Sequence, residues 1–196
     1  MEVEHADQPS ARERLLTAAN ELFYEEGVHT VGIDRVIERA GVAKATLYST
    51  FGSKDGLIRS YLESRHASRK ERLIEGVAAH DNPRERLLSV FDVLHQSISD
   101  PGYRGCAFVN ASAEADLGSP ILEVADENRT WLRLFLAELA AEAGAGDPPL
   151  LARRLMVLYD GAGVAARMDG DLQAATGARA MAASLLDAAI VHGVSG

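Results

Sequence analysis

A short stretch of the chain gathers hydrogen-bond donors on one predicted helix, a composition that suits contact with a phosphate-lined groove. The helix is predicted from Ala43 to about Phe51, because Leu47 and Phe51 stand four residues apart and would face inward together. Its other faces carry one lysine, hydroxyl groups and a phenol, and a second lysine follows the helix: Lys44, Thr46, Tyr48, Ser49, Thr50 and Lys54. Such groups bind phosphate oxygens and the edges of bases.

The element that positions this helix is predicted just before it. Ile33, Val36, Ile37 and Ala40 are apolar at helical spacing, and Gly41-Val42 provides a tight turn with one buried residue. A helix, a glycine-containing turn and a second helix form the motif whose second helix enters the DNA major groove.

Residues 30–58 resemble the TetR/AcrR family of bacterial transcriptional repressors. They match the family's pattern in register at Ala40-Gly41-Val42, Leu47-Tyr48, Phe51, Lys54 and Leu57. They depart from it at Gly32, Ile37, Ala43, Ala45, Ser49 and Thr50. These departures leave the fold prediction intact, but no operator sequence is predicted from them.

Geometry and resemblance together suggest roles for the donors. Lys44 and Thr46 stand near the start of the second helix and are predicted to reach base edges, with Lys44 suited to guanine O6 and N7. The resemblance implies that Tyr48 and Lys54 contact phosphates, although packing and a plain surface charge are their alternative roles. Further candidates for phosphate contacts are Thr30, Arg35, Ser49 and Thr50.

Capping signals divide the whole chain into helices, and no strand-like alternation is present, so the sequence predicts an all-α fold. Ser10-Ala11-Arg12-Glu13 is a capping box that starts a first helix ending at Gly27. Further helices are expected from Ser53 to about His80 and over about 84–99, 105–115, 121–143, 149–168 and 173–192. We expect a three-helix DNA-binding domain over 1–57 and a larger helical effector-binding and dimerisation domain over 58–196.

The last two predicted helices combine leucines with small residues, which allows helices to approach closely. An internal core would explain this composition, but TetR-like proteins pair two such helices with a second copy of the chain. The resemblance therefore favours a homodimer that reads a palindrome with two recognition helices. The residues concerned are Leu150, Leu151, Leu155, Leu158, Ala162 and Ala165, and then Ala178, Met181, Ala182, Leu185, Leu186, Ala189 and Ile190.

The resemblance also implies an effector pocket in the second domain. Aromatic residues with a few polar groups would suit a small hydrophobic molecule, although most buried aromatic residues serve only packing. The segment Gly105–Ala111 resembles a stretch found in a subset of these regulators. The candidate pocket residues are Phe91, His95, Tyr103, Cys106, Phe108, Asn110, Trp131 and Phe135.

Charge is unevenly distributed in this acidic chain of net charge -9. Residues 43–72 hold seven basic and three acidic residues, whereas residues 61–196 hold 13 basic and 19 acidic ones. Positive charge confined to one region argues against general nucleic-acid binding. The start MEVEHADQPSARER lacks the basic end and apolar stretch of a signal peptide. A lone cysteine is compatible with a reducing compartment, so a cytoplasmic protein is expected.

An enzyme and a helical adaptor or sensor are the alternatives to a ligand-responsive repressor. No enzyme is predicted and neither a cofactor nor a metal is expected, because no catalytic motif is present and the histidines lack ligand spacing. These histidines are His5, His29, His66, His80, His95 and His192. A ligand-independent helical adaptor, or a redox or electrophile sensor acting through Cys106, remains as the alternative. Sequence-specific DNA affinity separates the regulator from an adaptor.

Overall fold

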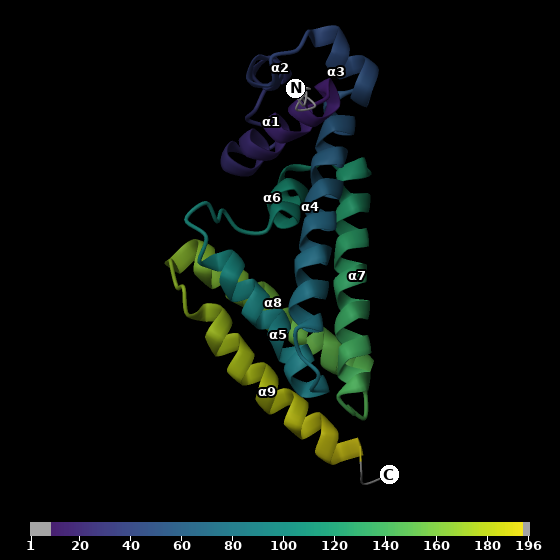
Figure 1. Cartoon of the computed structure of the whole chain (residues 1–196), viewed down its shortest axis with the longest axis vertical. Coiled ribbons are helices and arrows are strands. Elements are labelled where there is room, and N and C mark those ends of the chain that lie inside the picture. The colour runs from purple at the N-terminus through teal and green to yellow at the C-terminus, as the bar shows by residue number, and fades with distance from the viewer. Residues whose placement is uncertain (1–8, 194–196) are drawn as a thin grey trace, which may run out of the picture. The chain divides into compact units, whose positions relative to one another are not determined.

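A computed structural model describes residues 9–193 of the chain. Within that range the protein contains helices and no strand, so the predicted all-α class is confirmed (Figure 1). Residues 1–8 lie outside the described residues, and they include most of the N-terminal stretch in which no signal-peptide pattern is expected. The helices are α1 Ala11–Glu26, α2 Ile33–Ala40, α3 Lys44–Phe51, α4 Lys54–Ala78, α5 Pro83–Ile98, α6 Ala107–Glu114, α7 Pro120–Glu142, α8 Pro148–Asp169 and α9 Ala174–Gly193.

Side-chain caps set several of these helix starts. The Ser10 Oγ accepts a hydrogen bond from the Glu13 N–H at 3.2 Å, and the Glu13 carboxylate accepts one from the Ser10 N–H at 2.7 Å. This predicted capping box is confirmed, and the bond from the Ser10 backbone is the main cause of a lowered pKa of Glu13. Asn82 caps α5 and Ser119 caps α7, each directly before a proline in the first turn.

The chain forms two compact units. The first unit holds α1, α2, α3, the part of α4 up to Arg65, and residues 107–124 with α6. The second unit holds residues 66–106 and the chain from Ala125 onward. The domains expected from the sequence, 1–57 and 58–196, divide the chain at another place. The sequence also did not indicate that α6 would belong to the same unit as the helix-turn-helix.

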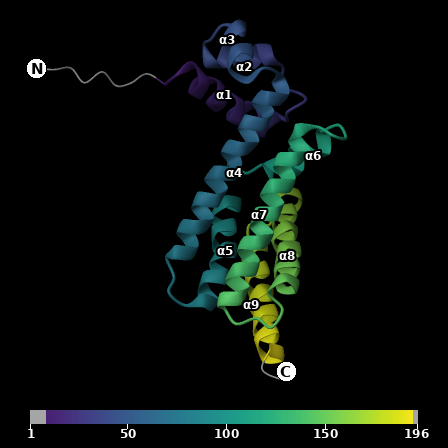
Figure 2. The same cartoon turned by 90° about the vertical axis from the view of Figure 1, so that its right-hand side faces the viewer.

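The core of the first unit forms where α1 packs on α2 and α3 (Figure 2). Leu15, Leu22 and Phe23 of α1 are buried, as are Val36 of α2 and Leu47 of α3. The ring of Phe23 also meets Tyr61 of α4 edge-on, with 5.7 Å between centroids. Burial of these large apolar side chains fixes α2 and α3 against the rest of the unit.

The second unit is built around α5, α8 and α9, which lie side by side (Figures 1 and 2). Alanines of α9 allow the close approach to α5 and α8, and many residues of the two predicted stripes, such as Leu155 and Leu186, are core. Arg84 of α5 makes two hydrogen bonds to Asp187 of α9, at 3.0 and 3.1 Å. These bonds lower the pKa of Asp187. No helix in the described part of the chain is long and apolar enough to cross a membrane.

Candidate nucleic-acid interface

The turn between α2 and α3 depends on a glycine. Gly41 has φ 63° and ψ 42°, the left-handed conformation that side chains with a Cβ disfavour. The N–H of Gly41 donates to the Glu38 carbonyl, and the N–H of Val42 donates to the Ile37 carbonyl, each at 3.2 Å. This pattern ends α2 with its carbonyls satisfied and turns the chain into α3. From α1, the Arg14 Nε donates to the last carbonyl of α2, at Ala40, over 3.1 Å.

Helix α3 divides into a buried side and a polar side. Leu47 is fully buried, and Phe51 is partly buried beneath the Arg12 guanidinium, 5.7 Å from its ring centroid. Tyr48 is 45% exposed, which argues against a purely packing role for this ring. The α3 residues predicted as DNA contacts are exposed, except that Thr46 is half-buried.

The exposed lysine at the start of α3 already has a partner. The Lys44 Nζ lies 2.9 Å from Oδ1 of Asp34 in the first turn of α2. This hydrogen bond raises the pKa of Lys44. Asp34 was not among the predicted residues, and its place ten residues earlier in the chain gave no signal for the pairing. If Lys44 reads a base, as the sequence predicts, it would first have to exchange this carboxylate for DNA.

Two hydroxyl groups of α3 turn back onto their own helix. The Ser49 Oγ and the Thr50 Oγ1 both donate to the Thr46 carbonyl, at 3.0 and 2.7 Å. Their hydrogens are therefore engaged, and a rotation about χ1 is needed before either hydroxyl donates to a phosphate.

The remaining three candidates are Thr30 in the turn between α1 and α2, Arg35 in α2 and Lys54 at the start of α4. Thr30 is exposed. The Lys54 Nζ donates to the His29 carbonyl at 3.4 Å, which is a long bond. Within residues 9–193 no carboxylate pairs with this lysine. Arg35 binds both oxygens of Glu26, which raises the pKa of Arg35 and lowers that of Glu26. Lys54 is thus better placed than Arg35 to contact a phosphate.

A carboxylate of α6 holds the same turn. Oε2 of Glu114 accepts a hydrogen bond from the His29 N–H at 2.9 Å, and its Oε1 lies against Gly27. His29 therefore links Glu114 through its N–H and Lys54 through its carbonyl. The sequence gave no indication of this contact, because 85 residues separate its partners.

The excess of positive charge over residues 43–72 does not form one exposed patch. Arg59 pairs with Glu63 one turn further along α4, at 2.9 Å. Arg65 stacks 4.0 Å from the ring centroid of Tyr24. Lys44 and Lys54 are the basic residues of this stretch that lie within or directly after the helix-turn-helix, so the charged part of the interface is small.

The eight residues predicted for an effector pocket are distributed over both units. Phe108 and Asn110 lie on α6 in the first unit, where Phe108 is buried and Asn110 is exposed. The other six lie in the second unit: Phe91, His95, Tyr103, Cys106, Trp131 and Phe135.

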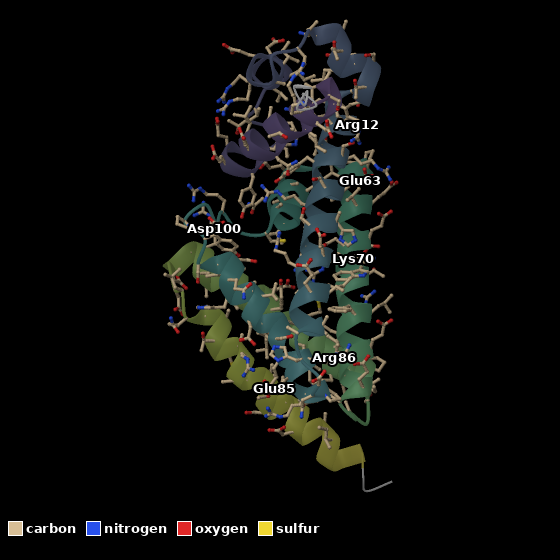
Figure 3. The ribbon with its side chains drawn as sticks, in the orientation of Figure 1. Arg12, Glu63, Lys70, Glu85, Arg86 and Asp100 are labelled. Carbon is tan, nitrogen blue, oxygen red and sulfur yellow. The ribbon has the colours of Figure 1, made fainter. Side chains whose placement is uncertain are left out.

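One aromatic cluster of the second unit joins α4 to α7. Trp131 stacks on Phe135 at 5.0 Å, and His66 meets the same indole edge-on at 5.6 Å. The Nζ of Lys70, which Figure 3 labels on α4, lies 5.6 Å from the Trp131 centroid. The His66 Nδ1 is 3.1 Å from Oδ1 of the buried Asn128.

A second cluster of this unit surrounds Tyr159 of α8. Phe91 of α5 lies 6.1 Å from the Tyr159 ring, and the Arg69 guanidinium lies 5.0 Å from the same centroid. The half-buried Cys106 is one of the groups that act electrostatically on Arg69. The Tyr103 hydroxyl donates to a carbonyl of α8 at 3.2 Å. Sequence patterns did not mark Arg69 or Tyr159 as members of this cluster.

Comparison with known proteins decides the family. A family model described as "Bacterial regulatory proteins, tetR family" matches residues 15–61, which span α1, α2, α3 and the start of α4. The crystal structure of SCO4454, a TetR-family transcriptional regulator from Streptomyces coelicolor, is 34% identical with a TM-score of 0.86. The match covers 92% of this chain and 96% of that one. The chain belongs to the TetR family of transcriptional regulators.

Relatives of this TetR-family regulator differ in the direction of regulation. The HTH-type transcriptional repressor NemR of Escherichia coli K12 is 28% identical over 80% of this chain and 84% of its own length. The HTH-type transcriptional activator FasR of Mycolicibacterium smegmatis is 37% identical, but over 47% of this chain and 43% of its own length. Family membership alone therefore does not fix whether this regulator represses or activates.

Proposed function

We propose that this TetR-family regulator is a cytoplasmic, homodimeric repressor that leaves a palindromic operator when a small effector binds the second unit. The observation that carries the proposal is the α2–α3 motif, whose buried side is fixed by Leu47 and whose exposed side offers hydrogen-bond donors. The long match with the repressor NemR supports repression over activation. Catalysis has no part in this mechanism, and neither a cofactor nor a metal is required.

Exposed apolar residues on α8 support a dimer. Val157, Val164 and Met168 are 71%, 51% and 78% exposed, and Gly161 lies between them at helical spacing. An exposed apolar stripe of this kind is typical of helices that pack against another chain. Dimerisation by α8 and α9 would present two copies of α3, and a palindrome read in successive major grooves requires them about 34–36 Å apart.

Within the DNA-binding unit we assign different roles to the two lysines. Lys44, with Thr46, reads base edges, whereas Lys54, with Tyr48, contacts phosphates. Thr30 supplies a further phosphate contact, and Arg35, Ser49 and Thr50 do so once their present bonds rearrange. If Lys44→Ala lowered the affinity equally for operator and scrambled DNA, the base-reading role of Lys44 would be wrong.

The contact between Glu114 and His29 offers a route from α6 to the DNA-binding residues. A displacement of α6 would release the His29 N–H and shift the backbone to which Lys54 donates. Effector binding then changes the equilibrium between two arrangements of the motif by its difference in affinity for them. We expect Glu114→Ala to weaken the effect of effector on operator binding more than Glu138→Ala, which removes an exposed carboxylate of α7. Equal effector affinity for free and operator-bound dimer would exclude this mechanism.

Selection of bound sequences from a random DNA pool tests the proposal most directly. We expect a palindromic motif in replicate selections with the wild-type dimer, and none with Lys44→Ala/Lys54→Ala. Promoters that contain the motif then provide reporters for the direction of regulation. Failure of a folded dimer to enrich any motif at low salt, with or without cell extract metabolites, would contradict sequence-specific DNA binding.

A redox or electrophile sensor acting through Cys106 is the second candidate function. The specific observation in its favour is that the half-buried thiol lies in the field of Arg69, directly before α6. With a maleimide, the thiolate sulfur bonds to an alkene carbon, the alkene electrons pass towards the carbonyl, and solvent protonates the other carbon. Release of wild-type protein from operator by N-ethylmaleimide, with Cys106→Ala unaffected, would support this mechanism; unchanged binding of alkylated protein would exclude it.

A further inference from the structure

The guanidinium of Arg69 on α4 packs in the cluster around Tyr159. Its charge lies 5.0 Å from the centroid of Tyr159, which is itself buried against Phe91. Burial is the largest influence on this guanidinium and acts against its charge. Tyr159 and Cys106 act in the opposite direction, so the pKa of Arg69 is raised on balance and the group stays charged.

This half-buried arginine has no carboxylate partner within 4.0 Å among the residues that the structure describes. Asp160, a carboxylate that acts electrostatically on Arg69, is paired with Arg129 at 2.9 Å instead. The contrast with Arg179 is informative: that guanidinium also points inward, but Glu85 and Asp92 bind it at 2.6 and 3.0 Å (Figure 3 labels Glu85). A half-buried arginine without a carboxylate partner is less well hydrated than an exposed one, and an anionic ligand would neutralise it.

One polar atom in the described part of the second unit is buried without a hydrogen-bond partner. The His95 Nδ1 is buried and has no hydrogen-bond partner among the described residues. His95 stands four residues after Phe91 on α5, so the two side chains share one face of the helix. Buried polar atoms without partners are uncommon and call for an explanation, such as a ligand.

We propose that Arg69 binds the carboxylate of the effector, which is a small molecule with an aromatic or aliphatic body and one acid group. The planar guanidinium presents paired N–H groups that match a carboxylate, and the ring of Tyr159 beside it provides an apolar surface for the body. The inference rests on the proposed effector role of this unit, and it replaces the purely hydrophobic effector expected from the sequence with an acid.

Thermal unfolding with matched ligand pairs tests the inference without DNA. The probes are benzoate, phenylacetate, cinnamate and octanoate, each compared with its primary amide. We expect at least one acid to raise the Tm of the wild-type protein with concentration while its amide does not. Arg69→Gln should lower the affinity for that acid by at least about tenfold, and Arg69→Lys should retain part of the affinity. Arg72→Gln removes the same charge from an exposed position on α4 and should bind as the wild type does.

The ligand-free protein supplies an independent measurement. Because Arg69 lacks an acidic partner, Arg69→Met should melt at or above the wild-type Tm, whereas loss of a structural ion pair would lower it. The inference is overturned if no acid exceeds its amide, if Arg69→Gln binds as the wild type does, or if Arg69→Met melts well below it. Acid binding that leaves operator affinity unchanged would instead contradict the proposed effector mechanism, and failure to bind any operator would contradict the proposed regulator.

Discussion

The Lys44 Nζ lies 2.9 Å from Oδ1 of Asp34, so the first residue of the recognition helix α3 is paired with the first turn of α2. Both side chains are largely exposed, and water therefore screens the pair. We predict that it matters for DNA binding rather than for stability. The lysine predicted to read a base is held by a carboxylate that the negatively charged groove of DNA would repel.

Asp34→Asn should therefore increase the affinity for DNA of any sequence. The substitution removes a negative charge beside the groove, so affinity should rise by about threefold to tenfold at low salt. On DNA that lacks the operator bases, the freed Lys44 can contact phosphates instead, which favours scrambled DNA in particular. The ratio of operator to scrambled affinity should fall. Fluorescence anisotropy with both duplexes measures this change, with Glu71→Gln on α4 as the control for loss of one exposed acid. An unchanged ratio would show that Asp34 does not restrict Lys44.

Lys54→Ala should lower the affinity for operator DNA and for scrambled DNA by the same factor. A phosphate contact carries no sequence information, and each one adds about 0.9 to the slope of log affinity against log salt concentration. The slope should accordingly become flatter by about one for each protomer's contact. Titrations from low to moderate salt test this, and Lys70→Ala in the second unit is the control. A loss confined to the operator would instead make Lys54 a base-reading residue.

Gly41→Ala should destabilise the motif because an alanine at φ 63° is strained, although open space surrounds its Cβ. The left-handed conformation costs about 1–2 kcal/mol, which corresponds to a fall in Tm of roughly 2–8 °C in a chain of this size. Gly32→Ser is a matched control, since Gly32 caps α2 at φ -77° with open space around it. Serine suits that position and should leave the Tm unchanged or slightly raised. Equal Tm values for the two variants would contradict the proposed strain.

Acid should loosen the attachment of α9 to α5. The bonds from Arg84 lower the pKa of Asp187 below its ordinary 3.8. The stability from this ionised carboxylate is therefore present above that ordinary value and is lost as the pH falls through the lower folded-state pKa. In melting curves below pH 5, Asp187→Asn should show a shallower decline of Tm with acid than the wild type. Asp171→Asn, in the turn before α9, is the control. Parallel declines of the Asp187 variant and the wild type would exclude the contribution.

The helices and their ends were predictable because their signals are local. The capping box of Ser10 and Glu13, the prolines after Asn82 and Ser119, and the turn at Gly41 each act within a few residues. The polar side of α3 was predictable for the same reason, since Leu47 and Phe51 fix which face turns inward. The predicted DNA contacts themselves remain predictions.

Long-range partners were not predictable. Glu114 meets the His29 N–H across 85 residues, and Arg69 reaches Tyr159 across a separation of ninety. Helical spacing gives the face on which a residue lies, but not the helix that packs there. The same limit explains why a basic run appeared as one charged region, although Arg59 is paired and Arg65 and Arg69 turn inward onto aromatic rings.

The sequence by itself determined an all-helical chain of the TetR family with a helix-turn-helix at residues 33–51, since propensity, capping and turn geometry are encoded within each segment. Tertiary structure alone decided that Asp34 holds Lys44 and that α6 packs in the unit of the helix-turn-helix. It also decided that Arg69 is half-buried against Tyr159, with no carboxylate bound to it among the residues that the structure describes. Such relationships depend on which side chains meet when distant segments pack, and on the water removed when they do.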